Sequence, residues 1–152
     1  MDVTYQPRIP ADPAYLQALG RAAYNFAYLE WVVVWTIVKL SADGFGSVPK
    51  REPSRRICSA LVRAIANTSP PLDNGLRRRL VKFEEVFRGS IDVRNRLIHA
   101  HPYTASDGKQ QLGGGGGLEW PIEEVYEAAK LFEDIAIEGN DIFHGDLARA
   151  RP

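Results

Sequence analysis

Residues 12–40 read DPAYLQALGRAAYNFAYLEWVVVWTIVKL and form the longest periodic segment of the 152-residue sequence. Asp12 followed by Pro13 is typical of a helix start, because Asp caps free N–H groups and proline tolerates the first helical position. Apolar residues then recur three and four apart to the end of the segment, which predicts one long helix. Its most apolar part, residues 31–38, is far shorter than the roughly 20 residues that cross a bilayer. We therefore expect a core helix and no membrane segment.

Apolar side chains occupy two sides of this first helix. One stripe should face the core and is interrupted only by Glu30; it consists of Leu16, Leu19, Ala23, Phe26, Glu30, Val33, Ile37 and Leu40. The other stripe is largely aromatic and consists of Tyr24, Tyr28, Trp31, Trp35 and Val38. A helix that is apolar over most of its circumference is buried on both sides. The aromatic stripe is therefore either a dimer interface, where Trp and Tyr are enriched, or ordinary core packing.

Three further helices follow from the same periodicity. The first is expected from Pro53 to Ala66, with Ile57, Leu61 and Ile65 four apart. The next begins at Leu72 or Asp73 and ends near Ala100, because Pro102 disfavours its continuation. The last begins at Pro121 and ends near Phe143, with a short frayed tail beyond Gly145. All four predicted helices are thus closed by recognisable start or stop signals.

Five consecutive glycines, Gly113 to Gly117, precede the last of these helices. No Lys-Ser/Thr pair follows them, so they predict a flexible loop or irregular hairpin tip and not a phosphate-binding loop. The sequence as a whole predicts a single all-α domain over residues 1–152. Its core should span about 12–143, with short tails at both ends. We expect a bundle of four to five helices with a Gly-rich loop before the last one.

Composition excludes several classes of protein. Hydrophobic residues make up 45% and charged residues 25%, which is the balance of a globular domain and not of a disordered chain. Cys58 is the only cysteine, so no intrachain disulfide can form, and on a helix it is expected to act as a small buried hydrophobe. Residues 1–13 lack the basic start and apolar run of an export signal. We expect a cytoplasmic protein.

Charge is unevenly distributed although the formal net charge is zero. Between residues 50 and 96 there are twelve Lys and Arg against five Asp and Glu, whereas residues 119–146 hold nine acids and one lysine. A basic middle and an acidic last helix suit a nucleic-acid surface or a charge-matched protein contact. Solvated helix faces would give the same distribution, so the choice depends on the motif described next.

Polar residues of the third predicted helix form one stripe: Glu85, Arg88, Asp92, Asn95 and His99, with Arg96 beside it. Arg94 instead falls inside the apolar arc, where an unpaired guanidinium is costly. Glu30 is the one acid on the core stripe of the first helix. We therefore expect an ion pair between Arg94 and Glu30.

The segment DVRNRLIH, residues 92–99, resembles the R-x4-6-H motif of the HEPN superfamily (higher eukaryotes and prokaryotes nucleotide-binding domains), including an Asn after the Arg. Such domains are small bundles of four or five helices with this motif near the end of the third helix and often a Glu on a long first helix. The resemblance covers residues 12–143. The motif alone is short, so the resemblance also depends on Glu30 and on the order of the helices.

Many members of that superfamily are metal-independent endoribonucleases whose two motifs meet across a homodimer cleft. The resemblance implies that Arg94 and His99 are the catalytic pair and that Asn95 assists them. Glu30 and Asp92 would support them, and Arg88, Arg96 and His101 are candidate RNA contacts. It also implies an RNA substrate, a homodimer, no cofactor and a role as a toxin or defence effector. A cognate antitoxin or neighbouring defence protein is then an expected partner.

This chemistry is reasonable without a metal. The three histidines, His99, His101 and His144, have no metal-binding spacing, and Cys58 is alone, so we expect no metal site. Histidine titrates near neutrality and can take or give a proton, while a guanidinium offers a fixed fork to phosphate oxygens. These are the groups that RNA cleavage through the 2′-hydroxyl requires.

Two features qualify the resemblance. Arg94 and His99 lie five residues apart, about 140° around a helix, so both must border one cleft from different sides. In the superfamily's toxins that pair with nucleotidyltransferases a tyrosine follows the motif, whereas this chain has His101 there and Tyr103 two residues later. The alternatives are a structural Arg94–Glu30 pair with His99 as a helix cap, and a catalytically inactive module that binds a nucleotide, an RNA or a partner protein.

Overall fold

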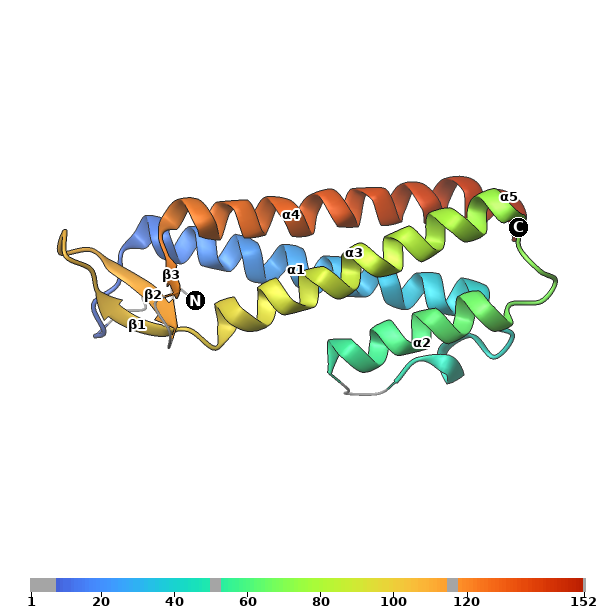
Figure 1. Ribbon diagram of the computed structural model, residues 1–152, viewed down its shortest axis with the longest axis horizontal. Coiled ribbons are helices and arrows are strands. Elements are labelled where there is room, and N and C mark those ends of the chain that lie inside the picture. The colour runs from blue at the N-terminus through green and yellow to red at the C-terminus, as the bar shows by residue number, and fades with distance from the viewer. Residues whose placement is uncertain (1–7, 50–52, 115–117, 152) are drawn as a thin grey trace, which may run out of the picture.

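The computed structural model describes residues 8–49, 53–114 and 118–151 and shows a bundle of four long helices with a small sheet at one end (Figure 1). The elements in chain order are α1 (Pro13–Leu40), a 3-10 turn η1 (Gly44–Ser47), α2 (Ser54–Asn67), α3 (Asn74–Ile98), β1 (His101–Thr104), β2 (Gln110–Gly114), β3 (Leu118–Trp120), α4 (Ile122–Asp141), a π-helical segment η2 (Ile142–Leu147) and α5 (Ala148–Ala150). The predicted helical bundle is confirmed.

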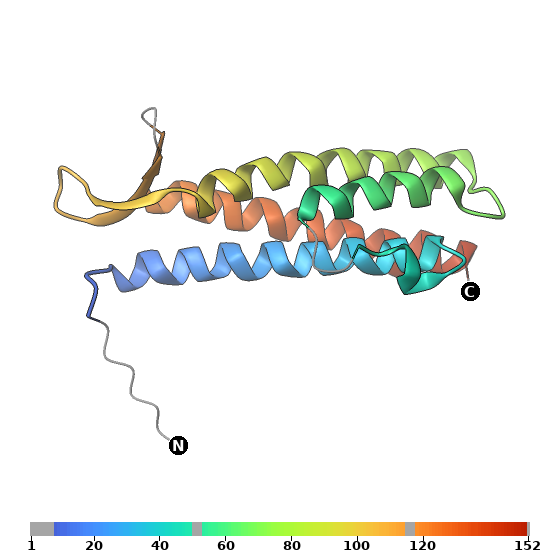
Figure 2. The ribbon, with the colours of Figure 1, turned by 90° about the horizontal axis from the view of Figure 1, so that it is seen from below.

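The helices differ in how much of the bundle they cover. α1 and α4 pack along their length, and α3 runs in the opposite direction beside them (Figures 1 and 2). α2 is about half as long as α1 and packs against α1 and α3 at the end away from the sheet. The sheet-side parts of α1 and α3 therefore have no α2 packed against them.

Side-chain caps begin two of the long helices where the sequence predicted them. Asp12 Oδ1 accepts hydrogen bonds from the N–H groups of Ala14 at 2.8 Å and Tyr15 at 3.1 Å. Asp73 Oδ1 does the same for Gly75 and Leu76 at the start of α3. These bonds satisfy donors that the helix itself leaves free. α3 ends at Ile98, two residues before the predicted end.

The sequence predicted only a flexible loop or irregular hairpin tip between the last two long helices, whereas the structure forms a small sheet there. β1 pairs with β2 and β2 with β3, both antiparallel, in the order β1-β2-β3. Gly113 and Gly114 belong to β2, whereas Gly115 to Gly117 lie outside the described residues. The Tyr15 hydroxyl joins this sheet to α1, because it donates to the Trp120 carbonyl at 2.7 Å and accepts from the Leu112 N–H at 3.0 Å.

The C-terminal end is more ordered than expected. Helical structure continues from α4 through η2 and α5 to Ala150, so the predicted frayed tail beyond Gly145 is wrong. Leu147 is fully buried. Arg79 of α3 also holds this end, with Glu138 at 2.8 Å and Asp146 at 2.6 Å. Apolar burial and a double ion pair together explain the continuation.

The core contains one polar cluster beside the predicted apolar stripes. Cys58 is buried as expected, but its thiol donates a hydrogen bond to Glu84 Oε1 at 3.1 Å. Burial, together with the hydrogen bond to Glu84, raises the pKa of this thiol to about 12. Arg88 Nε lies 3.7 Å from the same carboxylate oxygen, so the buried acid has both a thiol and a guanidinium beside it.

The two predicted stripes of α1 differ in their exposure to solvent. Phe26, Val33, Ile37 and Leu40 of the first stripe are buried, whereas Tyr24, Tyr28, Trp31 and Trp35 of the aromatic stripe are exposed. Core packing is therefore the wrong interpretation of the aromatic stripe. The prediction is also wrong for Leu16 and Ala23 of the first stripe, which are exposed. No helix within the described ranges has both the length and the apolar character that membrane crossing requires.

Candidate functional site

Arg94 lies near the sheet-side end of α3 and points towards α1. Its guanidinium carbon sits 5.4 Å from the centre of the Phe26 ring, and Nη1 donates to Asn95 Oδ1 at 2.9 Å. Both Arg94 and Asn95 are half-buried. A guanidinium over an aromatic face is attracted by the ring's negative face. The structure thus brings together Arg94 and Asn95, the first two residues of the predicted site.

Glu30 does not pair with Arg94, and this prediction is wrong. Ser54, the first residue of α2, donates its hydroxyl to Glu30 Oε2 at 2.5 Å. Ser54 is buried and Glu30 half-buried, so the bond fixes the start of α2 against α1. Arg94 stacks on Phe26, one helical turn before Glu30. The acid therefore positions the start of α2 and does not neutralise the arginine.

Arg94 consequently has no carboxylate within ion-pair distance among the residues that the structure describes. A half-buried cation without an acid carries a free energy cost that an anion would relieve. Phe26 and Asn95 hold its orientation, since the ring supports one face of the guanidinium and the amide oxygen binds one of its nitrogens. The remaining N–H groups form a planar fork of the kind that matches phosphate oxygens.

His99 ends α3. It is the C-cap residue, and its backbone N–H bonds to the carbonyl of Asn95 at 3.1 Å. Its side chain is exposed, and within the described part of the chain it makes no hydrogen bond to Arg94 or Asn95. The predicted catalytic histidine therefore lies at the end of the same helix as Arg94 without a hydrogen bond to it among the described residues. The position of His99 at the C-cap fits the capping interpretation equally well.

The supporting and RNA-contact candidates fall into two groups. Asp92 and Arg88 are engaged: Asp92 bonds Arg55 of α2 at 2.5 Å, and Arg88 lies beside Glu84. Arg96 is exposed in the last turn of α3. Asp92 therefore ties α2 to α3 and does not support Arg94, whereas Arg96 is placed for contact with a ligand at this end of the bundle.

His101 lies in β1 and not in a solvated turn. It pairs with Gly113 in the sheet register and lines a hollow of about 300 Å³ together with Tyr103, Leu118 and Glu119. Its side chain is exposed. Because the sheet follows α3 directly, His101 remains only two residues from His99 along the chain. Both histidines are thus presented at the sheet-side end of the molecule.

Sequence reasoning missed three residues that shape the site. Phe26 was assigned to the core stripe, and its position one turn from Glu30 could have marked it as a neighbour of Arg94. Ser54 and Arg55 hold the start of α2, and nothing in their spacing identifies Glu30 and Asp92 as their partners. No group of three or more His, Cys, Asp or Glu in the described ranges is arranged to hold a metal ion.

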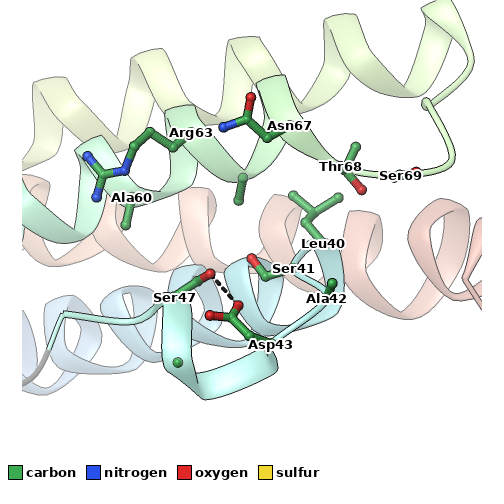
Figure 3. A pocket seen from close by; sticks show the side chains of 12 residues that line it. Leu40, Ser41, Ala42, Asp43, Ser47, Ala60, Arg63, Asn67, Thr68 and Ser69 are labelled. Carbon is green, nitrogen blue, oxygen red and sulfur yellow. Dashed lines mark hydrogen bonds between the residues drawn. The ribbon is translucent and has the colours of Figure 1, made fainter.

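A separate cavity of about 430 Å³ lies at the other end of the bundle, between η1 and α2 (Figure 3). Its polar lining includes Asp43, Ser47, Arg63 and Asn67. Asp43 is already bonded to Ser47 at 2.5 Å, and the Arg63 side chain extends along α2 away from that acid (Figure 3). These side chains do not converge on a common point, so the cavity does not compete with Arg94 as the candidate site.

Comparison of the chain with family models, with curated proteins and with solved structures gives no match.

Proposed function

We propose that this protein is a metal-independent endoribonuclease that acts as a homodimer, with Arg94, Asn95 and His99 at its active site. The observation that carries the proposal is the half-buried Arg94 guanidinium, which is oriented by Phe26 and Asn95 and has no acidic partner among the described residues. A cation held in this way is prepared for an anionic ligand. The HEPN-like motif that contains it supplies the reaction, and a toxin or defence role inside the cell is part of the same proposal.

The reaction follows from the chemistry of these groups. One histidine takes the proton of the ribose 2′-hydroxyl, and the 2′-oxygen attacks the adjacent phosphorus. The bond from phosphorus to the 5′-oxygen breaks, and a second histidine gives that oxygen its proton. Arg94 stabilises the negative charge on the non-bridging oxygens at the transition state. The products carry 2′,3′-cyclic phosphate and 5′-hydroxyl ends.

The reaction moves two protons, but the motif supplies only one histidine per chain. The proposed active site therefore needs two copies of the chain. Two copies provide a base and an acid of the same type. His101 is the neighbouring histidine of the same chain, and its hollow on the sheet can contact the RNA on either side of the cut.

The test is incubation of the purified protein with a panel of RNAs in EDTA. We expect cleavage by the wild type and a loss of about 10²–10⁴ in rate for Arg94→Ala and for His99→Gln. Arg78→Ala, an exposed arginine on the same helix, is the matched control and should cleave normally. A 2′-deoxy substitution at the cut position should block the reaction.

The second candidate is a module that binds RNA or a nucleotide without turnover. It is favoured by the exposed His99 side chain, which makes no hydrogen bond to Arg94 or Asn95 within the described part of the chain. If the wild type leaves every RNA intact but binds it, and Arg94→Ala abolishes the binding, the nuclease proposal fails and this candidate replaces it.

A further inference from the structure

The outer side of α1 carries an exposed row of aromatic rings. We call Tyr24, Tyr28, Trp31 and Trp35, together with Phe45 of η1, the aromatic face. Tyr24 is 71% exposed and Trp31 is 52% exposed. The opposite side of α1 is buried against the other helices, so these rings are not needed for the core of this chain. An apolar surface of this size on a helix marks an interaction site.

Contacts between neighbouring rings fix the orientations of the side chains on this face. Trp31 and Trp35 meet edge to face with centroids 5.7 Å apart, and Trp35 meets Phe45 in the same way at 5.2 Å. The Tyr28 hydroxyl accepts a hydrogen bond from the Asn140 amide of α4 at 3.1 Å. Side chains that are already fixed lose little conformational entropy on binding, which favours a specific contact.

A groove lies directly beside these rings. It has a volume of about 450 Å³ between α1 and the end of α4, and its lining consists of Tyr28, Trp31, Val32, Trp35, Asn140, Phe143 and His144. The π-helical segment η2 places Phe143 and His144 on the far wall, where their rings pack edge to face at 4.9 Å. The groove is thus mostly aromatic, with an amide and an imidazole as its polar groups.

The face offers a protrusion as well as a hollow. Tyr24 is its most exposed ring and lies outside the groove, seven residues before Trp31. Seven residues of helix correspond to about 10 Å along the axis. A two-fold axis near Tyr28 would place Tyr24 of each copy over the groove of the other. Self-complementarity of this kind is what a symmetric interface between identical chains requires.

The exposed area agrees with a second copy as the occupant. An aromatic side chain buries roughly 150–250 Å² in full, so the exposed parts of these five rings amount to about 500 Å². A stable interface needs about 800 Å² from each partner. The aromatic face therefore supplies more than half of that area, and the polar groups around it can supply the rest.

The charges of the chain and of this surface also agree with a second copy as the partner. The chain has a formal net charge of zero, so two copies do not repel each other. The α4 side of this surface carries Glu127, Lys130 and Glu133 beside Arg21 of α1, so acids and bases are balanced there. Mixed charge around an apolar centre is the usual composition of a protein–protein interface.

We propose that the aromatic face is the surface through which two copies of this chain associate, with Tyr24 of each copy seated in the Tyr28–Trp31–Phe143 groove of the other. This inference goes beyond the proposed function and does not rest on it, because the aromatic face lies on the side of α1 opposite Phe26 and Arg94 and does not itself join the two active sites. Association itself is measured without RNA, so the two proposals can fail separately.

The first test is the dimer dissociation constant by analytical ultracentrifugation. We expect a wild-type dimer, and at least about 30-fold weaker association for Tyr24→Ala and for Trp31→Glu, because central aromatic residues dominate such interfaces. Val62→Glu on α2 is the matched control, since Val62 is 47% exposed and lies outside the aromatic face. It should associate like the wild type, and circular dichroism should show all four proteins folded.

The second test traps the contact. Tyr28→Cys near the proposed axis should give a disulfide-linked dimer on mild oxidation, whereas Val62→Cys should not. The native Cys58 is buried and should not form an intermolecular disulfide. A strictly monomeric wild type, or a dimer unaffected by both aromatic substitutions, would overturn the inference. Monomeric variants that still cleave RNA would uphold this interface and overturn the two-chain active site.

Discussion

The two ends of α3 differ in what surrounds them. From Asn74 to Asp92 the helix packs against α2, and Arg79 bonds two carboxylates of the C-terminal end. Beyond Asp92 there is no α2, and Arg94 rests on Phe26 without an acid among the described residues. One arginine thus has two acidic partners, and the other, about 22 Å away along the same helix, has none. The first end therefore contributes to stability, whereas the second leaves the Arg94 guanidinium available to an anionic ligand.

The largest test of this comparison truncates an apolar side chain at each end. Phe83 is 1% exposed in the covered half, and Ile98 is 46% exposed at the other end. We expect Phe83→Ala to lower the free energy of unfolding by about 3–5 kcal/mol, because it leaves a cavity, and Ile98→Ala to lower it by less than about 1 kcal/mol. Urea unfolding followed by circular dichroism measures both. Equal losses would show that the uncovered end is as tightly packed as the covered one.

A second test adds a methyl group instead of removing one. A Cβ on Gly139 of α4 would lie 2.6 Å from Phe83 Cζ and 2.7 Å from Val32 Cγ1, whereas a Cβ on Gly89 of α3 meets nothing within 4 Å. Gly139→Ala should therefore destabilise by about 1–3 kcal/mol through overpacking. Gly89→Ala should stabilise by about 0.5–1 kcal/mol, since alanine favours the helix. Thermal unfolding of both variants checks the opposite signs.

The two arginines can be compared directly. Arg79→Met loses two partly exposed ion pairs and should cost about 1 kcal/mol. Arg94→Met keeps the contact with Phe26 and removes a half-buried charge, so its unfolding free energy should stay within about 0.5 kcal/mol of the wild type. RNA cleavage or binding should nevertheless be lost only in Arg94→Met. A larger stability loss at Arg94 than at Arg79 would contradict the assignment of function to this end.

The smallest effect is expected at the boundary between the two ends. Arg55 and Asp92 form an ion pair at 2.5 Å, but both side chains are more than half exposed. A double-mutant cycle with Arg55→Ala and Asp92→Ala should give a coupling free energy below about 0.5 kcal/mol, and 1 M salt should remove most of it. A coupling above about 2 kcal/mol would mean that this pair, and not Ser54 with Glu30, fixes the start of α2.

The helical part of the fold was predictable because its signals are local. Asp12 and Asp73 cap the helices that they precede, and the spacing of apolar residues identifies the buried side of each helix. The sheet was not predictable in this way. Its strands are only three to five residues long, and a proline in β1 and glycines in β2 hide the alternation that marks a strand.

The candidate site was predictable only in part. The helical wheel placed Arg94 among apolar side chains, and its guanidinium does lie over the Phe26 ring. The wheel placed Asn95 on the polar stripe with His99, whereas the Asn95 amide oxygen accepts a hydrogen bond from Arg94. It could not give the partner of Glu30, because that depends on where α2 begins in space. Ser54 lies 24 residues from Glu30, and neither residue carries a local signal of the other. Likewise, the exposure of the aromatic stripe depends on which sides of α1 the other helices cover.

Among the described residues, Tyr15 is the one helical residue whose side chain forms hydrogen bonds with the sheet. One phenol oxygen receives the Leu112 N–H and donates to the Trp120 carbonyl, so it pins β2 and β3 to α1 at the same point. Without that oxygen, as in Tyr15→Phe, the burial of Trp120 and the chain connections to α3 and α4 would be left to hold the strands. The sheet, which carries His101 in β1, would then move relative to the end of α3 while the helices keep their positions. Faster hydrogen exchange at the Leu112 amide would measure that motion directly.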